Sequence, residues 1–396
     1  MLVCEMKDET IIVTAGRHPE QNHGVVNPPV YHASTIVQPS LAARAEMQQA
    51  RARGERVLAY GRRGSPTMFA LEDLVCAIEG GWRARIYPSG LAAIATALMA
   101  YVEAGDHVLV SDNVYGPCRH FCDTALKRFG VETTFFDPLI DDALAELIRP
   151  NTKLLYLESP GSLTFEVQDV PRLADIAHGR GLTVLMDNTW ATPLYFKPFA
   201  HGVDVSIHAA TKYLGGHSDM MLGVVSANRA AYPALDDCTN RFGQTAGPDD
   251  VYNCQRGTRT LSVRLRQHFE NGVALAEWLA GQPEVERVMH PALKDDPGHA
   301  LWRRDFTGAS GLFGIVLKPC SEAALAAFVD NLELFHIGAS WGGYESLVTA
   351  NNPNSLRSAR KWPYDGATVR FHAGLEAVDD LIADLDAGLG RLRKAA

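Results

Sequence analysis

Apolar and polar positions alternate in blocks along the middle of the chain, from about residue 71 to residue 258. Short apolar runs read HVLVSD, KLLYLES, LTVLMDN and VSIHAA, and each ends in turn residues. Between them lie stretches such as LAAIATALMAYVEA and VPRLADIAHGR, whose apolar residues recur with helical spacing. Apolar strands that alternate with amphipathic helices are typical of a parallel sheet covered on both faces. The pattern predicts a doubly wound α/β domain.

The pattern changes on both sides of this block. After a helical stretch that begins near Leu261, we expect strands in SGLFGIVLK and TVRFHAGLE and helices in EAALAAFVDNL and VDDLIADLDAGLGRL, which together indicate a smaller α+β unit. Before residue 62, the prolines of PPVYHASTIVQPS exclude long regular elements, and only residues 41–53 have a helical pattern. We therefore predict an arm that packs on a neighbouring subunit (1–62), the α/β domain (63–258) and a C-terminal α+β domain (259–396).

The composition narrows the classes of function. Of 396 residues, 46% are hydrophobic and 21% are charged, proportions that suit a folded globular protein. The net charge of -9 argues against nucleic-acid binding, which depends on excess Lys and Arg. No apolar run reaches the roughly 20 residues that span a bilayer, and the acidic N-terminus lacks a secretory pattern. We expect a cytoplasmic protein without nucleic-acid or membrane partners.

Seven cysteines are scattered along the chain without a CxxC pair. They form neither a disulfide framework nor a zinc-binding pattern. Cys118 and Cys122 could share a helix face, but two thiols do not complete a metal site. We expect reduced thiols, Cys4 included, and no bound metal.

Chemically active residues stand at the ends of three predicted strands. Ser89-Gly90-Leu91 opens a helix, Asp187 closes LTVLMD, and Lys212 follows VSIHAAT. Ligands of open α/β sheets bind outside the carboxyl ends of the strands, and free N–H groups at a helix start bind phosphate. A carboxylate keeps a pyridine nitrogen protonated, and a lysine amine forms an imine with an aldehyde. Together these residues fit a phosphorylated pyridine aldehyde as cofactor, but without further context a helix cap, a capping Asp and a surface Lys explain them more simply.

A long motif around the lysine narrows this interpretation. The run DVSIHAATKYLGGHS, residues 204–218, resembles the cofactor-attachment motif of the Cys/Met-metabolism family of pyridoxal-phosphate enzymes. The segments YGRRGSPT, YPSGLAAI, DNVYGP, ESPGSLTFEV, MDNTWATP, RGTRTLSVRLRQH, SWGGYES and VRFHAGLE follow in the family's order, over nearly the whole chain. The resemblance implies pyridoxal 5'-phosphate as cofactor and the aspartate-aminotransferase-like fold type I. It also implies homotetramers of paired dimers that share active sites between subunits.

The resemblance assigns the site residues to three groups. The residues that act in the reaction are Lys212, Tyr115 and Tyr60. The residues that hold the cofactor are Lys212, Asp187, Tyr115, Ser89, Gly90, Leu91, Thr211, Tyr60 and Arg62. The residues that bind substrate are Arg370, Ser340 and Trp341.

The expected roles follow from side-chain chemistry. Lys212 would hold the cofactor as a Schiff base and then act as the base, with Asp187 on the pyridine nitrogen and Tyr115 stacked on the ring. Tyr60 and Arg62 would reach the phosphate from the neighbouring subunit. Arg370 would clamp the substrate carboxylate with its planar guanidinium. Ser340 would orient that arginine or the substrate, and Trp341 would form a wall of the pocket.

Two departures from the wider family bear on the reaction. Ala209 stands where many members have Ser, and Ser162 stands where ESPxNP has Asn. Both, together with Trp341, resemble the bacterial β-lyase branch. This implies α,β-elimination of L-cystathionine to L-homocysteine, pyruvate and ammonia, with cystine and cysteine as further sulfur amino-acid substrates. Two alternatives stay open: cleavage at Cγ by a γ-lyase or γ-synthase, and a catalytically idle cofactor-binding regulator.

Overall fold

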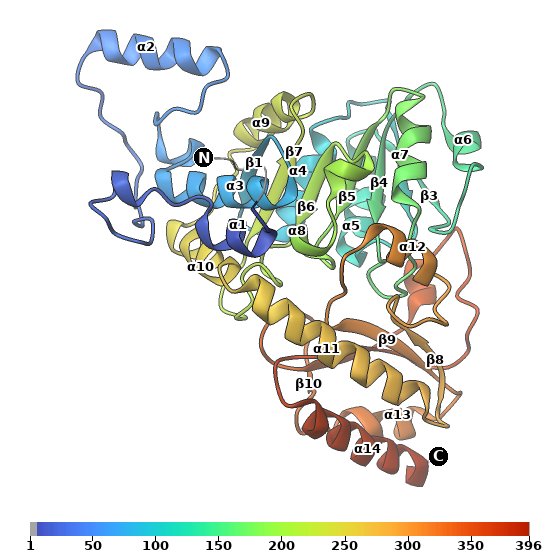
Figure 1. The fold of residues 1–396 in the computed structure, drawn as a ribbon. Helices are drawn as coiled ribbons and strands as arrows, with labels where there is room; N and C mark the ends of the chain where they lie inside the picture. Colours follow the sequence, from blue (N-terminus) through green and yellow to red (C-terminus); the bar gives the residue numbers. More distant parts are fainter. Residues whose placement is uncertain (1–5, 396) are drawn as a thin grey trace.

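The structure, a computed structural model, describes residues 6–395, so Cys4 lies outside the described residues. Two β-sheets form separate layers of the molecule, and helix α11 (Leu261–Ala280) extends from the first toward the second (Figure 1). The larger sheet has seven strands and the smaller has five. This arrangement confirms the predicted α/β fold with a second unit at the C-terminus.

The larger sheet has the strand order β1-β7-β6-β5-β4-β2-β3. Its strands are β1 (Arg83–Tyr87), β2 (His107–Ser111), β3 (Glu132–Phe136), β4 (Thr152–Glu158), β5 (Thr183–Asp187), β6 (Val205–His208) and β7 (Gly223–Ala227). Strands β2 to β6 pair in parallel, whereas β7 is antiparallel to both of its neighbours. The four apolar runs of the sequence correspond to β2, β4, β5 and β6, which confirms those predictions.

Helices cover both faces of this sheet. They are α3 (Pro66–Glu79), α4 (Gly90–Met99), α5 (Gly116–Phe121), the π-helical turn Cys122–Leu126, α6 (Leu144–Leu147), α7 (Val170–His178), α8 (Thr192–Tyr195), α9 (Tyr232–Arg241) and α10 (Pro248–Thr258). Side chains alternate along β4, so Leu155 and Leu157 pack with α7 on one face while Leu154 and Tyr156 pack with α4 and α5 on the other. Because both faces are buried, the strand is apolar at nearly every position.

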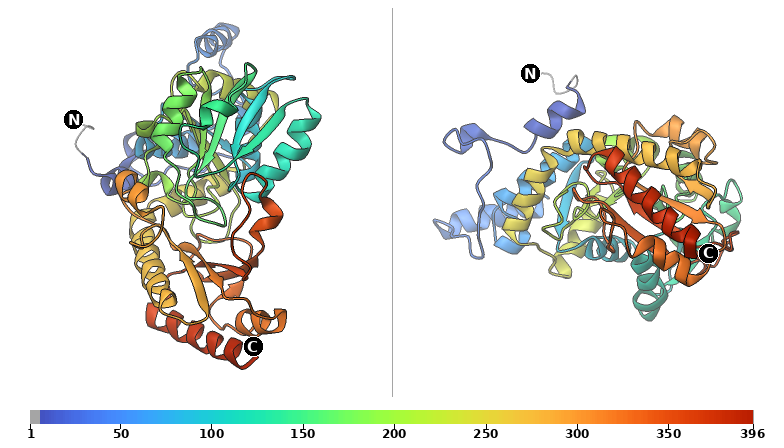
Figure 2. Two further views of the ribbon diagram at one scale, coloured as in Figure 1. Left: turned by 90° about the vertical axis from the view of Figure 1, so that its right-hand side faces the viewer. Right: turned by 90° about the horizontal axis from the view of Figure 1, so that it is seen from below.

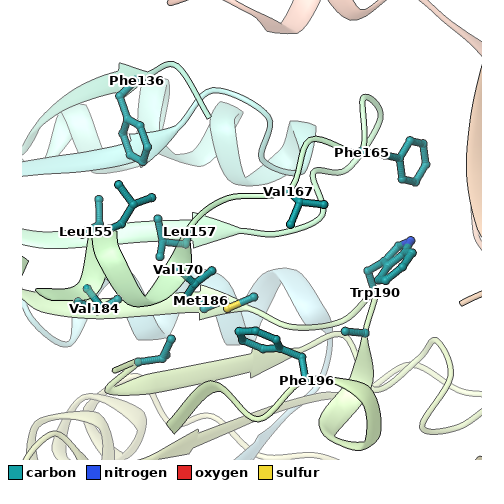
Figure 3. Packing of buried hydrophobic residues seen from close by; sticks show 14 of the residues in the cluster. Phe136, Leu155, Leu157, Phe165, Val167, Val170, Val184, Met186, Trp190 and Phe196 are labelled. Atoms are coloured by element: carbon teal, nitrogen blue, oxygen red, sulfur yellow. The ribbon is translucent and has the colours of Figure 1, made fainter. Parts of the chain in front are cut away.

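The cluster on the α7 face extends toward the carboxyl ends of the strands. Figure 3 shows Leu155 and Leu157 above Val184 and Met186, with Phe165 and Trp190 farther to the right in the same cluster. Burying one such side chain contributes roughly 1.5–3 kcal/mol. The strand ends are therefore held firmly, and the side chains that follow them have fixed positions.

The C-terminal unit is a sheet in the order β10-β11-β12-β9-β8 with helices against it. Its elements are β8 (Val285–Met289), α12 (His299–Asp305), β9 (Leu312–Leu317), α13 (Glu322–Val329), β10 (His336–Ile337), β11 (Leu347–Asn351), β12 (Thr368–His372) and α14 (Val378–Ala395). The predicted strands correspond to β9 and β12 and the predicted helices to α13 and α14, so these predictions are confirmed. The domain boundaries at residues 62 and 258 stay a prediction.

The N-terminal arm divides into two parts. Helix α1 (Asp8–Thr14) packs on its own chain through the fully buried Ile12, and Arg259 Nη1 donates to the Ile12 carbonyl over 2.7 Å. Helix α2 (Leu41–Ala52) instead stands away from the body in Figures 1 and 2, and Leu41 is 83% exposed. Within residues 6–395, no helix has both the length and the apolar character needed to cross a membrane.

Candidate active site

A cavity of about 350 Å³ lies at the carboxyl ends of β4, β5 and β6, where the C-terminal unit meets the larger sheet. Ligand pockets of this size are typical of small-molecule sites. The predicted site residues that line it are Ser89, Gly90, Leu91, Tyr115, Asp187, Thr211, Lys212, Trp341 and Arg370. They come from segments up to about 280 residues apart in sequence, so the fold alone brings them together.

Lys212 lies in the turn that follows β6 and has its amine in this cavity. Nζ donates to Ser340 Oγ over 2.6 Å and lies 5.4 Å from the centre of the Trp341 ring. Burial and, to a smaller extent, the charge of Arg370 lower the pKa of Lys212 to about 8 against the opposing effect of Asp187. An amine with this pKa is partly unprotonated near neutral pH, so it can act as nucleophile and as base.

Asp187 ends β5 and is only 7% exposed. Its Oδ1 accepts from the Thr189 backbone N–H over 2.9 Å and from Thr189 Oγ1 over 2.5 Å. Burial nevertheless raises the pKa of Asp187 above its ordinary value. A cationic or protonated nitrogen beside this carboxylate would stabilise its charged form. Asp187 therefore suits a protonated ring nitrogen.

The start of α4 lines one side of the cavity. Ser89 is the N-cap, and its Oγ accepts from the Ala92 N–H over 3.1 Å, so its side chain serves the helix. The first backbone N–H groups of the helix have no intrahelical partner and suit a phosphate. A side chain at Gly90 would place its Cβ 2.6 Å from the Cβ of Ala209, so glycine is required for this close approach.

Thr211 lies on the same side of the cavity, but its hydroxyl also has partners within the chain. Oγ1 accepts from the Leu222 N–H over 2.9 Å and donates to the Leu222 carbonyl over 3.2 Å. The turn before Lys212 is thereby tied to the segment that leads into β7. Thr211 thus contributes to the shape of the site as well as to its polar surface.

The C-terminal unit supplies one cation, Arg370, and the aromatic side chain of Trp341 to the cavity. Arg370, on β12, is 9% exposed, and its Nη2 donates to the Ala339 carbonyl over 3.2 Å. Burial lowers the pKa of Arg370 to about 10, so the guanidinium stays charged at neutral pH. Its remaining donors can bind a carboxylate in bidentate geometry. Ser340 and Trp341 lie on the loop that reaches Lys212.

Tyr60 and Arg62 do not line this cavity in their own chain. Tyr60 is 45% exposed, and Arg62 Nη1 donates to the Asn240 carbonyl over 3.1 Å. Both residues belong to the arm and its junction with α3. Among the described residues, the cations that line the cavity are Lys212 and Arg370.

Tyr115 precedes α5 and is 44% exposed, with its side chain at the cavity. Its backbone N–H donates to Glu158 Oε2 over 2.7 Å. Partial burial and the nearby Glu158 raise the pKa of the Tyr115 phenol above its ordinary value. The tyrosine is therefore a neutral aromatic surface held in place through its main chain.

Glu158 and Thr189 also line the cavity, although neither was predicted from the sequence. Glu158 ends β4 directly beside Asp187 on the parallel neighbour β5. Burial, reinforced by the charge of Asp187, raises the pKa of Glu158 well above its ordinary value. The rule that pointed to Asp187 applies equally to the end of KLLYLES, so Glu158 could have been found. Thr189 had no comparable signal, because a threonine after a strand is common.

The arrangement fits a phosphorylated pyridine aldehyde. The cavity combines a helix start for the phosphate, a buried carboxylate for the ring nitrogen and an amine of lowered pKa for the aldehyde. Within residues 6–395, the cysteines are free thiols and no cluster of potential ligands could hold a metal ion. The residues that could hold the group are the start of α4, Asp187, Tyr115 and Lys212.

Comparisons with known proteins agree with this chemistry. The family model for Cys/Met metabolism PLP-dependent enzymes matches residues 9–390. A putative cystathionine beta-lyase from Rhizobium johnstonii (strain DSM 114642 / LMG 32736 / 3841) is 47% identical over 383 residues, which are 96% of this chain and 95% of that protein. The cystathionine beta-lyase of Escherichia coli (strain K12) is 45% identical and covers 98% of this chain and 100% of its own length.

A solved structure is similar over the same extent. Cystathionine gamma synthase from Xanthomonas oryzae pv. oryzae, in complex with aminoacrylate and cysteine, has a TM-score of 0.89 and 31% sequence identity. The match covers 99% of this chain and 100% of that one. Both sheets and every wall of the cavity therefore lie within the matched region.

Proposed function

Because the chain belongs to the family of Cys/Met metabolism PLP-dependent enzymes, we propose that it cleaves the Cβ–S bond of L-cystathionine. With one water, the products are L-homocysteine, pyruvate and ammonia. The observation that carries the proposal is the meeting of Lys212, Asp187 and Arg370 in one cavity. The relatives named cystathionine beta-lyases, at 47% and 45% identity, favour cleavage at Cβ over the γ-synthase reaction of the more distant neighbour.

Pyridoxal phosphate, when bound, supplies an aldehyde carbon for amines and a protonated ring that withdraws electrons from Cα. Lys212 would hold the aldehyde, Asp187 the ring nitrogen and the start of α4 the phosphate. Tyr115 would lie against the ring through its aromatic face. These assignments are supported by the donor types and by their positions around the cavity.

Side chains of the protein would bind the substrate and transfer its protons. Arg370 binds the α-carboxylate of the substrate, which fixes Cα relative to Lys212. The Lys212 amine accepts the Cα proton near neutral pH, because its pKa is lowered to about 8. The Cβ–S bond breaks, the sulfur leaves with homocysteine, and the three-carbon fragment is hydrolysed to pyruvate and ammonia. Lys212 would then return its proton to the departing sulfur.

We further infer that the working enzyme is a homotetramer of paired dimers in the cytoplasm. Tyr60 and Arg62 support shared sites, since they lie outside the cavity of their own chain. The helix start offers N–H groups but no arginine to a phosphate, and Arg62 from a neighbouring subunit would provide one. Mixing Lys212→Ala and Arg62→Ala proteins after partial unfolding tests whether two subunits share each site. In a hybrid dimer, shared sites would combine an intact Lys212 with an intact Arg62 and restore part of the activity. No restored activity in proven hybrids would contradict it.

Product analysis on the purified holoenzyme tests the reaction. With L-cystathionine, homocysteine and pyruvate in equal amounts support cleavage at Cβ. Cysteine with 2-oxobutyrate would instead show cleavage at Cγ. Absence of turnover on any sulfur amino acid, despite a cofactor that borohydride fixes to Lys212, would favour a regulatory protein. Peptide mapping of the reduced product locates the attachment residue.

A further inference from the structure

Behind Lys212, a buried histidine joins three segments that carry candidate site residues. His372 ends β12 and is 1% exposed. It follows Arg370 by two positions, so both side chains lie on the same face of the strand. Its Nδ1 lies 3.4 Å from Tyr213 Oη. Its Nε2 lies 3.1 Å from both the Gly342 nitrogen and the Gly343 carbonyl oxygen.

These contacts form a closed ring of bonded and hydrogen-bonded residues, which starts and ends at Lys212. Lys212 is bonded to Tyr213 in the chain, Tyr213 contacts His372, and His372 contacts Gly342. Gly342 follows the Ser340-Trp341 pair, and Ser340 Oγ accepts from Lys212 Nζ over 2.6 Å. A Cβ at Gly342, whose φ is +88°, would lie 2.8 Å from the Lys212 carbonyl carbon. The two backbones are therefore in direct contact.

In either neutral tautomer, the imidazole of His372 can hydrogen-bond both to Tyr213 and to the loop. When Nε2 is unprotonated, it accepts from the Gly342 N–H, and Nδ1–H donates to Tyr213 Oη. When Nε2 carries the proton, it donates to the Gly343 carbonyl, and Nδ1 accepts from Tyr213 Oη–H. His268 packs against the ring with a centroid distance of 5.0 Å. Burial, with His268 adjacent, holds the pKa of His372 well below its usual range, so the ring stays neutral.

We propose that His372 is a positioning residue that fixes the Ser340-Trp341 loop against Lys212 and thereby keeps the catalytic amine in a dry, hydrogen-bonded position. The loop has no strand of its own at Ser340, and two side chains of β12 tie it to the C-terminal unit: Arg370 at the Ala339 carbonyl and His372 at Gly342 and Gly343. If the contacts of His372 are lost, the loop moves and water reaches Nζ. The desolvation that lowers the pKa of Lys212 is then reduced. This inference rests on the proposed function, in which Lys212 is the base.

Three substitutions of His372 distinguish the contact of Nδ1 with Tyr213 from the contact of Nε2 with the loop. His372→Leu removes both. His372→Gln keeps a polar group near the Nε2 position and can still bind the loop, whereas His372→Asn keeps one near Nδ1 and can bind only Tyr213. His290→Leu is the matched control, because His290 is equally buried with a pKa lowered to about 4 and lies outside the cavity.

The first measurement uses cofactor-free protein and needs no substrate. An amine reagent labels the protein at a series of pH values, and peptide mapping gives the rate of labelling at Lys212 at each pH. The dependence of this rate on pH gives the pKa of the Lys212 amine. We expect His372→Leu and His372→Asn to raise this pKa by about 1 unit toward its ordinary value. His372→Gln should stay within about 0.3 unit of the parent protein, and His290→Leu should leave the value unchanged.

The second measurement is the split between kcat and KM for L-cystathionine. His372→Leu should lower kcat about 10- to 100-fold and change KM less than about threefold, since Arg370 is retained. His372→Gln should recover most of kcat, and His372→Asn should not.

Two outcomes would overturn the proposal. One is an unchanged Lys212 pKa in His372→Leu. The other, decisive if that variant does not fold, is identical behaviour of the Gln and Asn variants. Failure of the parent protein to cleave L-cystathionine would count against the proposed function alone, because the labelling experiment does not depend on turnover.

Discussion

The two walls of the cavity are built in opposite ways. On the sheet wall, Glu158 and Asp187 end neighbouring parallel strands in register, so the backbone ladder fixes both carboxyl groups. On the C-terminal wall, Ser340 and Trp341 lie in a loop whose position depends on side-chain contacts such as those of His372. The position of the sheet wall is therefore set by the backbone, whereas the position of the C-terminal wall is set by side chains.

The electrostatics of the two walls are opposite as well. Burial raises the pKa values of Glu158 and Asp187 on the sheet wall. It lowers the pKa values of Arg370 and His372 on the C-terminal wall. Each wall thus destabilises the charged form of its own groups until a ligand of opposite charge enters. A cationic ring nitrogen would stabilise the charged form of a carboxyl group on the sheet wall. The carboxylate of an amino acid would stabilise the charged form of Arg370 on the C-terminal wall.

The largest effect is expected at Lys212, where the walls meet. Lys212→Ala would remove both the proposed attachment point and the proposed base, so kcat should fall by about 10³-fold or more. Borohydride reduction should no longer fix the cofactor to the chain. Lys153→Ala, at an exposed lysine on β4, is the control and should behave as the parent protein. Retained labelling or turnover in Lys212→Ala would show that another amine does this work.

The next largest effect belongs to the sheet wall alone. Asp187→Asn keeps an oxygen for the two Thr189 bonds but removes the charge that we propose for the ring nitrogen. We expect kcat to fall about 10²- to 10³-fold with little change in thermal stability. Asp204→Asn, before β6 at the other end of the same sheet, tests whether any lost carboxylate has this effect. Equal activity of the two variants would refute the role of Asp187.

The sequence predicted the sheet wall better than the C-terminal wall, for a physical reason. Strands β2, β4, β5 and β6 are buried on both faces, so their apolar runs are visible without the structure. Strands β1 and β3 lie at the sheet edges and carry Arg83 and Glu132, which hid them. β7 was missed because GVVSA is short and rich in small residues.

Site residues follow the same division. Ser89, Asp187 and Lys212 were found because strand ends and helix starts have local signals. Ser340 and Arg370 were assigned only through the family resemblance, since nothing near Ser340 in sequence indicates its 2.6 Å contact with an amine 128 residues away. The roles of these residues stay predictions.

A smaller effect is expected on the C-terminal wall. Arg370→Lys keeps the charge but loses the planar pair of donors, and one charged hydrogen bond contributes about 1.5–3 kcal/mol. KM for L-cystathionine should therefore rise about 10- to 100-fold while kcat changes less. Arg287→Lys, on β8 with its bond to Tyr364, is the control in the same unit. A fall in kcat at constant KM would place Arg370 in the chemical step instead.

The smallest effect is expected on the free energy of unfolding, whose dependence on pH should differ between the groups of the two walls. Glu158 has a raised pKa in the folded state, so the folded protein binds its proton more tightly than the unfolded chain does. The stability that this proton contributes is present at low pH and is lost as pH rises above about 4.3, the ordinary pKa of glutamate. Glu158→Gln can still accept from the Tyr115 N–H and never ionises. We expect it to raise the free energy of unfolding by about 1 kcal/mol at pH 8 and to leave it unchanged at pH 4.

Urea unfolding of both proteins at the two pH values measures this difference. The C-terminal wall should respond in the opposite direction. His372 and His268 have lowered pKa values, so their contribution is present above about pH 6.5 and is lost as pH falls. Glu166→Gln, at a carboxylate paired with Arg357 outside the cavity, is the matched control and should not stabilise the protein. If Glu158→Gln destabilises the protein equally at pH 4 and pH 8, the residue is an ionised hydrogen-bond acceptor, and the contrast between the two walls is wrong at that position.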